Sequence, residues 1–271
     1  MKKILCLVFI LVFSACAFAD DDFYVGVLAQ LNMSEEEYND YVTESRNNVG
    51  FSFYVSDDGK CRFYDSLLTL QMALNAGEVQ EVRLPGIVGE YFVNSSPTYG
   101  ISAVSVSRPT YLAFGFLERN AALRDKINQV LKELKEDGTI ENLRVQYIEN
   151  FRTVGLHLIQ LPKFEGAETI KVALTGDLPP IDFVAPDGTP AGFNMAIISE
   201  IAKRAKINIE ILDTEAGARS AVLASGRADV VLWYKVTENY DHQPDIPSGV
   251  ILSEPYYYLT KFVHVRKKWR S

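Results

Sequence analysis

Short apolar runs and helical periods alternate along the first half of the chain. Residues 23–28 form an apolar run that predicts a strand, and Ser34 with Glu37 three positions later predicts the capped start of a helix reaching residue 46. Alternation of strand and helix is typical of an α/β protein with parallel sheets. Further strands are predicted at residues 51–55, 79–84 and 111–118, and further helices at 65–76 and 120–136.

The same alternation restarts at residue 169. Between the two halves, residues 151–168 have no sustained period and contain Pro162 and Gly166, which predicts a connector. At 271 residues the chain is long enough for two lobes of about 100 residues each. In the second half, strands are predicted at residues 170–174, 207–212, 228–233 and 256–265, and helices at 193–205 and 216–224.

The first nineteen residues have the pattern of a secretory signal peptide. Lys2 and Lys3 precede an apolar run at residues 4–13, and the sequence Ala-Phe-Ala at 17–19 offers a cleavage site. Residues 13–16 also resemble a bacterial lipobox, so a lipoprotein anchored through Cys16 is the alternative. No second apolar segment is long enough to cross a membrane. The mature chain is therefore expected in the periplasm or outside the cell.

Charge and cysteine usage exclude several classes of function. The whole chain carries a net charge of −8, and loss of the two signal lysines would make it −10, which argues against nucleic-acid partners and anionic lipid surfaces. After cleavage Cys61 is the sole cysteine, so no intrachain disulfide is expected. The three histidines are scattered without ligand spacing, and no cofactor motif is present, so neither a metal nor a cofactor is expected.

Two segments carry a resemblance to a known family, in reversed order. Residues 170–205 read IKVALTGDLPPIDFVAPDGTPAGFNMAIISEIAKRA, and LASGRADVVLW and LSEPYYY follow. This block resembles the opening of a family 3 extracellular solute-binding protein. The usual ending of that family resembles NAALRDKINQVLKELKEDGTIENLRVQYI, which stands first here, at residues 120–148.

The resemblance implies a circularly permuted, two-lobed α/β fold of the type II periplasmic binding protein class. Helix 120–136 should then pack in the same lobe as strand 170–174. Closure would be a hinge motion at the strands near residues 108–114 and 262–268. The expected organisation is a signal at 1–19, lobe 2 at 20–107, a return segment into lobe 1 at 108–150, a linker at 151–168 and lobe 1 at 169–271.

The implied function is non-enzymatic capture of a small-molecule solute between the lobes, for an ABC-type permease or a membrane sensor. One alternative is a degenerate member that no longer binds a solute and serves as an interaction module. Another is a periplasmic dehydratase-like enzyme, for which Asp177 and Glu215 are the acid–base candidates.

Candidate ligand-binding residues follow from the crevice at the carboxyl ends of the parallel strands. The adjacent aromatics Trp233 and Tyr234 could stack on a solute or could plug the cleft. Ser34 has a second role as a helix cap. The predicted set is Thr175, Asp177, Trp233, Tyr234 and Thr237 from lobe 1, and Asn32 and Ser34 from lobe 2.

The chain departs from the resembled family at its amino-acid anchors. An Arg should follow Thr237 to hold an α-carboxylate, but Tyr240 and Asp241 stand there, and Pro85 stands where an acid should hold the amino group. Arg219 could replace the missing Arg, although a solvated position on a helix face is the expectation. Standard amino acids are therefore expected to bind weakly or not at all.

Overall fold

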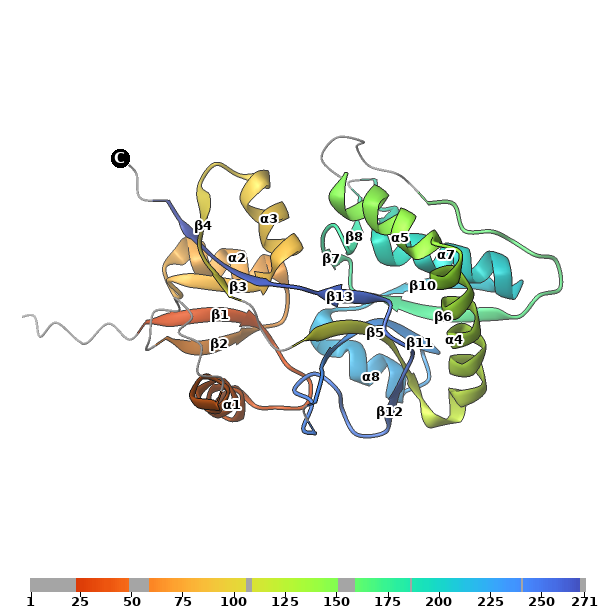
Figure 1. The fold of residues 1–271 in the computed structure, drawn as a ribbon, viewed down its shortest axis with the longest axis horizontal. Coiled ribbons are helices and arrows are strands. Elements are labelled where there is room, and N and C mark those ends of the chain that lie inside the picture. Colours follow the sequence, from red (N-terminus) through yellow and green to blue (C-terminus); the bar gives the residue numbers. More distant parts are fainter. Residues whose placement is uncertain are drawn as a thin grey trace, which may run out of the picture.

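The computed structural model describes residues 23–48, 59–105, 109–150, 159–185, 187–239 and 241–268. The signal peptide, Cys16 and the strand expected at residues 51–55 lie outside these ranges. Within them the strands form two main sheets and a small third one. Each main sheet has its own helices, and the two units lie side by side (Figure 1). We call them lobe 2, which contains β1, and lobe 1, which contains β6.

Lobe 2 is built on a five-stranded sheet in the order β2-β1-β3-β14-β4. β1 pairs in parallel with β2 and β3, whereas β14 runs antiparallel to β3 and β4. Figure 1 shows α2 and α3 on one side of these strands and α1 on the other. The elements are β1 (Tyr24–Leu28), α1 (Glu35–Asn48), β2 (Lys60–Tyr64), α2 (Leu67–Ala76), β3 (Glu81–Pro85), α3 (Gly86–Ser95), β4 (Tyr99–Ser105) and β14 (Phe262–Lys267).

Lobe 1 is built on a six-stranded sheet in the order β10-β6-β11-β5-β12, with β13 also pairing with β5. β6, β10 and β11 are parallel, and β5 is antiparallel to its neighbours. Its strands are β5 (Thr110–Leu117), β6 (Thr169–Leu174), β10 (Asn208–Asp213), β11 (Val230–Thr237), β12 (Val250–Leu252) and β13 (Tyr257–Leu259), with β7 (Asp177–Leu178), β8 (Asp182–Val184) and β9 (Pro190–Ala191) in the small sheet. Its helical elements are η1 (Glu118–Asn120), α4 (Ala121–Glu136), α5 (Thr139–Arg144), η2 (Val145–Glu149), α7 (Phe193–Ala205), η3 (Ala216–Ala218) and α8 (Arg219–Ala224).

The packing predicted for the helix at residues 120–136 is confirmed. α4 buries Ile127, Val130, Leu131 and Leu134 on one face. It packs on α7 and on β5, and β5 belongs to the same sheet as β6. Residues from both halves of the sequence therefore build one lobe. The circular permutation itself stays a prediction.

The chain passes between the lobes twice, once between β4 and β5 and once between β13 and β14. At the second passage the amide of Gly86 in lobe 2 donates a hydrogen bond of 2.8 Å to the carbonyl of Lys261. The single strand expected at residues 256–265 is therefore wrong, and so is the assignment of residues up to 271 to lobe 1. The apolar run is continuous, but its second part fills the position between β3 and β4, which buries Phe262, Val263 and Val265.

Local signals fix several helix ends. The predicted capping box at Ser34 is confirmed, because its hydroxyl accepts from the amide of Glu37 and the Glu37 carboxylate accepts from the amide of Ser34. α2 begins with a second capping box at Ser66 and ends at Gly77, which has a φ of 81°. Among the helices within the described ranges, none is both long and apolar enough to cross a membrane.

Candidate functional site

A small pocket lies between the two lobes. Lobe 2 contributes residues that follow β1 directly, such as Ala29, and lobe 1 contributes Leu178 and Ile181 from the segment after β6. This is the crevice at the carboxyl ends of the parallel strands. The cavity measures about 50 Å³, which is room for a few water molecules and too little for most solutes. Its polar lining consists of Gln30, Tyr38 and Arg83 from lobe 2 and Arg219, Lys235 and Asp245 from lobe 1.

Arg219 is the centre of the polar lining. It begins α8, and its side chain is 1% exposed. Its two terminal nitrogens donate to both carboxylate oxygens of Asp245, at 2.7 and 3.2 Å. It also donates to the carbonyls of Ala216 and Trp233, both at 2.8 Å, and its guanidinium carbon lies 3.6 Å from the centre of the Trp233 ring. The expectation of a solvated Arg on a helix face is wrong.

The reason for this error lies in the helix itself. The segment expected as one helix at residues 216–224 is a 3₁₀ turn followed by the six-residue α8. The register of a continuous α-helix does not apply across that junction, because a 3₁₀ turn advances the chain by a different angle per residue. Arg219 stands at the junction and points inward. The apolar period of this segment does not distinguish one continuous α-helix from a 3₁₀ turn followed by a shorter α-helix.

Asp245 was not predicted from the sequence. Besides both contacts to Arg219, its Oδ2 accepts from the amide of Lys235 at 2.9 Å. Asp245 lies between Pro244 and Pro247, in a segment without helical or strand period. No pattern in the sequence marks this loop acid as the partner of Arg219, which stands 26 positions earlier.

Lys235 connects the two lobes. Its ammonium donates to Oε1 of Gln30 in lobe 2 at 2.8 Å. Burial lowers the pKa of Lys235 to about 8; the Asp245 carboxylate opposes this shift, and the Arg83 and Arg219 charges add to it. The pocket therefore holds a cation that titrates just above neutral pH.

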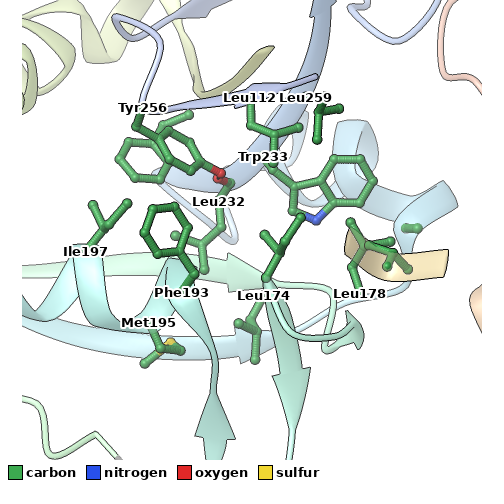
Figure 2. Packing of buried hydrophobic residues seen from close by; sticks show 14 of the residues in the cluster. Leu112, Leu174, Leu178, Phe193, Met195, Ile197, Leu232, Trp233, Tyr256 and Leu259 are labelled. Carbon is green, nitrogen blue, oxygen red and sulfur yellow. The ribbon is translucent and has the colours of Figure 1, made fainter. Parts of the chain in front are cut away.

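Behind the pocket, Trp233 is held by a buried polar chain. Its indole Nε1 donates to Oγ1 of Thr175 at 3.1 Å, and the Thr175 hydroxyl donates to Asp182 at 3.3 Å. Asp182 also accepts from the amide of Gly176 at 3.0 Å. Burial raises the pKa of Asp182 to about 7, and the nearby Asp177 charge adds to this shift. Figure 2 shows the apolar surroundings of Trp233, with Leu112, Leu174 and Leu178 among the residues of the same buried cluster.

Among the seven residues predicted for the site, Trp233 lines the pocket. Thr175 supports Trp233 from behind. Asp177 accepts from the amide of Leu67 at 3.3 Å, at the start of α2 in lobe 2, and so contacts the opposite lobe. Burial raises the pKa of Asp177. The other acid–base candidate, Glu215, is exposed on lobe 1. Neither acid lines the pocket.

Thr237 and Asn32 meet at Gln243 rather than in the pocket. The backbone of Thr237 pairs with the side-chain amide of Gln243 at 2.8 and 2.7 Å. Asn32 of lobe 2 donates its side-chain amide to the carbonyl of Gln243 and its backbone amide to the carbonyl of Pro244, at 2.9 and 2.8 Å. Thr237 and Asn32 thus hold the segment at residues 243–245 between the lobes. Ser34 caps α1 and makes no part of these contacts.

Tyr234 points away from the pocket. It follows Trp233 on β11, and successive residues of a strand face opposite sides. Its ring is fully buried with Val222 and Leu223, and it lies over Gly115 of β5. The two aromatics expected to act as a pair therefore pack in different apolar clusters, although the guanidinium of Arg219 lies near both rings, at 3.6 Å from Trp233 and 5.2 Å from Tyr234.

The contact of Tyr234 with Gly115 gives a stability prediction. A Cβ at Gly115 would lie 2.1 Å from Cε2 of Tyr234, so we expect Gly115→Ala to destabilise the protein by about 1–3 kcal/mol. Urea unfolding measures the change. Gly100→Ala in β4 is the control, because the atoms nearest to a Cβ there belong to the flexible Lys268 side chain, the closest at 3.2 Å. Equal stability of the two variants would contradict the described packing of Tyr234.

Comparison with known proteins gives one family match. Residues 170–270, over a third of the chain, match the sequence profile of the bacterial extracellular solute-binding proteins, family 3. The match begins at β6 and includes Arg219, Trp233, Lys235 and Asp245. No curated protein matches significantly.

Several solved structures show distant likeness. The ligand-binding component of an ABC-type import system from Staphylococcus aureus, with zinc bound, is 10% identical with a TM-score of 0.43; the match covers 90% of this chain but only 65% of that protein. Immunogenic lipoprotein A from Vibrio vulnificus is 12% identical with a TM-score of 0.40, covering 90% and 86% of the two chains. An ABC transporter periplasmic substrate-binding protein from Coxiella burnetii is 12% identical with a TM-score of 0.38, covering 90% and 84%. These likenesses assign no ligand.

Proposed function

We propose that the chain, whose residues 170–270 match the family 3 extracellular solute-binding proteins, captures a small anionic solute between its two lobes. The observation that carries the proposal is the pocket at the lobe interface, whose charged lining comes from both lobes. The lining contains three cationic residues, Arg83, Arg219 and Lys235, and one acidic residue, Asp245. In a site of low dielectric such an excess of positive charge favours an anion.

Arg83 and Lys235 are the residues assigned to the solute. Arg219 is already paired with Asp245. Arg83 belongs to β3 of lobe 2 and Lys235 to β11 of lobe 1, so an anion held by both draws the lobes together. Pro85, which stands where the resembled family has an acid, lines the same pocket and adds no negative charge. An anion without an amino group fits this lining better than a zwitterionic amino acid.

Capture requires the lobes to separate and close again, because the cavity of about 50 Å³ does not admit a solute of several heavy atoms. The two passages of the chain between the lobes are the natural hinges, close to those expected from sequence. Trp233 then serves as a wall of the pocket. The enzymatic alternative draws no support from this arrangement, since Asp177 and Glu215 do not come together in the pocket.

The direct test is thermal-shift screening of the purified mature protein at constant ionic strength. Succinate, sulfate and inorganic phosphate are compared with neutral glucose and cationic putrescine. An anion at 100 times its dissociation constant should add about 2.7 kcal/mol of stability. Stabilisation by glucose or putrescine, with no response to any anion, would contradict the proposed solute class.

Lys235 gives a prediction for the mechanism of capture. Lys235→Met should weaken anion binding by about 10- to 100-fold, the value of one charge-assisted hydrogen bond. Because the pKa of Lys235 is about 8, anion affinity of the native chain should fall between pH 7 and 9. The variant should lack that pH dependence. Titration calorimetry measures both effects, and Lys132→Met, at a 68% exposed position on α4, is the control.

Export and delivery complete the proposal. We assign the chain to the periplasm or the cell exterior, with an ABC-type permease or a membrane sensor as partner. Mass spectrometry of the mature N-terminus distinguishes the forms. A start at Asp20 indicates a soluble protein, an acylated Cys16 indicates a lipoprotein, and an intact Met1 would contradict export.

A further inference from the structure

The carboxylate of Asp245 makes the contacts that the carboxylate of a bound solute would make. Both carboxylate oxygens are held by the guanidinium fork of Arg219, at 2.7 and 3.2 Å, and the amide of Lys235 completes the set at 2.9 Å. Fork-to-fork pairing of this kind is the usual way in which an Arg recognises a carboxylate ligand. The Arg219 and Asp245 side chains are 1% and 2% exposed, so the pair is shielded from solvent, and both residues line the pocket between the lobes.

The backbone next to Asp245 also contacts both lobes. The carbonyls of Gln243 and Pro244 accept from the side chain and the amide of Asn32 in lobe 2. The side chain of Gln243 pairs with Thr237 in lobe 1. Residues 243–245 therefore bridge the lobes with polar contacts, which is what a solute does in a closed binding protein.

We propose that Arg219 is the anchor of a carboxylate-binding site and that Asp245 is its built-in occupant. The pair borders the interlobe cavity, which both side chains line together with Trp233. Removal of the Asp245 side chain would join its volume to that cavity and leave the three donors of the site in place. A small monocarboxylate can then take the position of the lost side chain.

This inference rests on the proposed function in one respect, namely that solutes enter the pocket between the lobes. It adds a restriction on that function. In the native chain an external carboxylate finds Arg219 already paired and meets only Lys235 and Arg83. Movement of residues 243–245 away from the pocket would expose Arg219 as a third cation and break the contact with Asn32.

The experiment is chemical rescue of Asp245→Gly with acetate, which has the atoms of the missing side chain beyond Cα. Melting temperatures are measured by circular dichroism in 100 mM sodium acetate and in 100 mM sodium chloride. With a dissociation constant on the order of 1 mM, acetate should raise the melting temperature of the variant by about 5 °C relative to chloride. The native chain should show a smaller difference, because Asp245 fills the site and acetate meets only Lys235 and Arg83.

Two controls separate this site from general effects of salt. Acetamide has the shape of acetate without its charge and should not rescue Asp245→Gly. The double variant Arg219→Met with Asp245→Gly lacks the anchor and should respond to acetate no more than the native chain does. Equal melting temperatures of Asp245→Gly in acetate and chloride, or an equal acetate response of the double variant, would overturn the inference.

A second variant covers the case in which Asp245→Gly does not fold in either salt. Asp245→Ala keeps Cβ and leaves the space of the carboxylate group alone, for which formate is the probe. Stabilisation by formate supports the inference, and its absence overturns it. Failure of this rescue together with anion capture by the native chain refutes the built-in occupant alone. Rescue without any anion binding by the native chain refutes the proposed function alone.

Discussion

Replacement of Arg219 by methionine is expected to destabilise the protein by about 3–5 kcal/mol, because it leaves the carboxylate of Asp245 buried without its counter-charge. Asp245 would keep the amide of Lys235 as a donor, which is too little for a charge that is 2% exposed. Trp233 would also lose the cation above its ring. Urea unfolding followed by circular dichroism measures the loss.

The double variant Arg219→Met with Asp245→Leu is the matched control. It removes both charges and fills the space with apolar atoms, so most of the lost stability should return. The difference between the double variant and the sum of the two single variants gives the interaction energy of the pair. A loss below about 1 kcal/mol for Arg219→Met would show that the pair is not held away from solvent as described.

The pair also shows why the sequence could not predict this part of the site. Arg219 and Asp245 are 26 positions apart and are brought together by the end of β11. Periodicity reports which face of an element is apolar, and it carries no information on which polar residue of a loop reaches another element. Candidates at strand ends could be predicted, and Trp233 was found in this way. The residue that pairs with Arg219 could not.

Much of the fold was accessible because its central elements have strong periods. α4 has a clear apolar face, α7 is apolar over most of its surface, and β6 and β11 are mostly apolar with one lysine each. β2 was missed because Lys60 and Arg62 interrupt its apolar residues.

Two other differences have separate causes. β4 was missed because it lies at the sheet edge, where its exposed Ile101 and Val104 do not alternate clearly with polar residues. The break between β13 and β14 was missed because the apolar residues are continuous across it, and their pattern does not indicate in which sheet each part pairs. Such choices depend on tertiary packing.

Asp182 gives the prediction with the second largest effect, on the dependence of stability on pH. The folded-state pKa of about 7 lies above the unfolded value of about 3.9, so the folded protein binds an additional proton between pH 4 and 7. Stability from this group is therefore complete below pH 4 and is lost as the pH rises through 7. Since a shift of one pKa unit corresponds to about 1.36 kcal/mol, the loss in the free energy of unfolding is on the order of 4 kcal/mol.

Asp182→Asn should remove this loss. The amide oxygen still accepts from Gly176, and the amide nitrogen can donate to Thr175, so the polar chain behind Trp233 is kept. We expect the variant to match the native chain below about pH 4 and to become progressively more stable than it up to about pH 7.5. The difference between the two chains at each pH is the quantity to measure, because groups distant from Asp182 titrate alike in both and cancel. Parallel stability curves would mean that Asp182 is ionised without cost in the folded protein, contrary to its burial beneath Trp233.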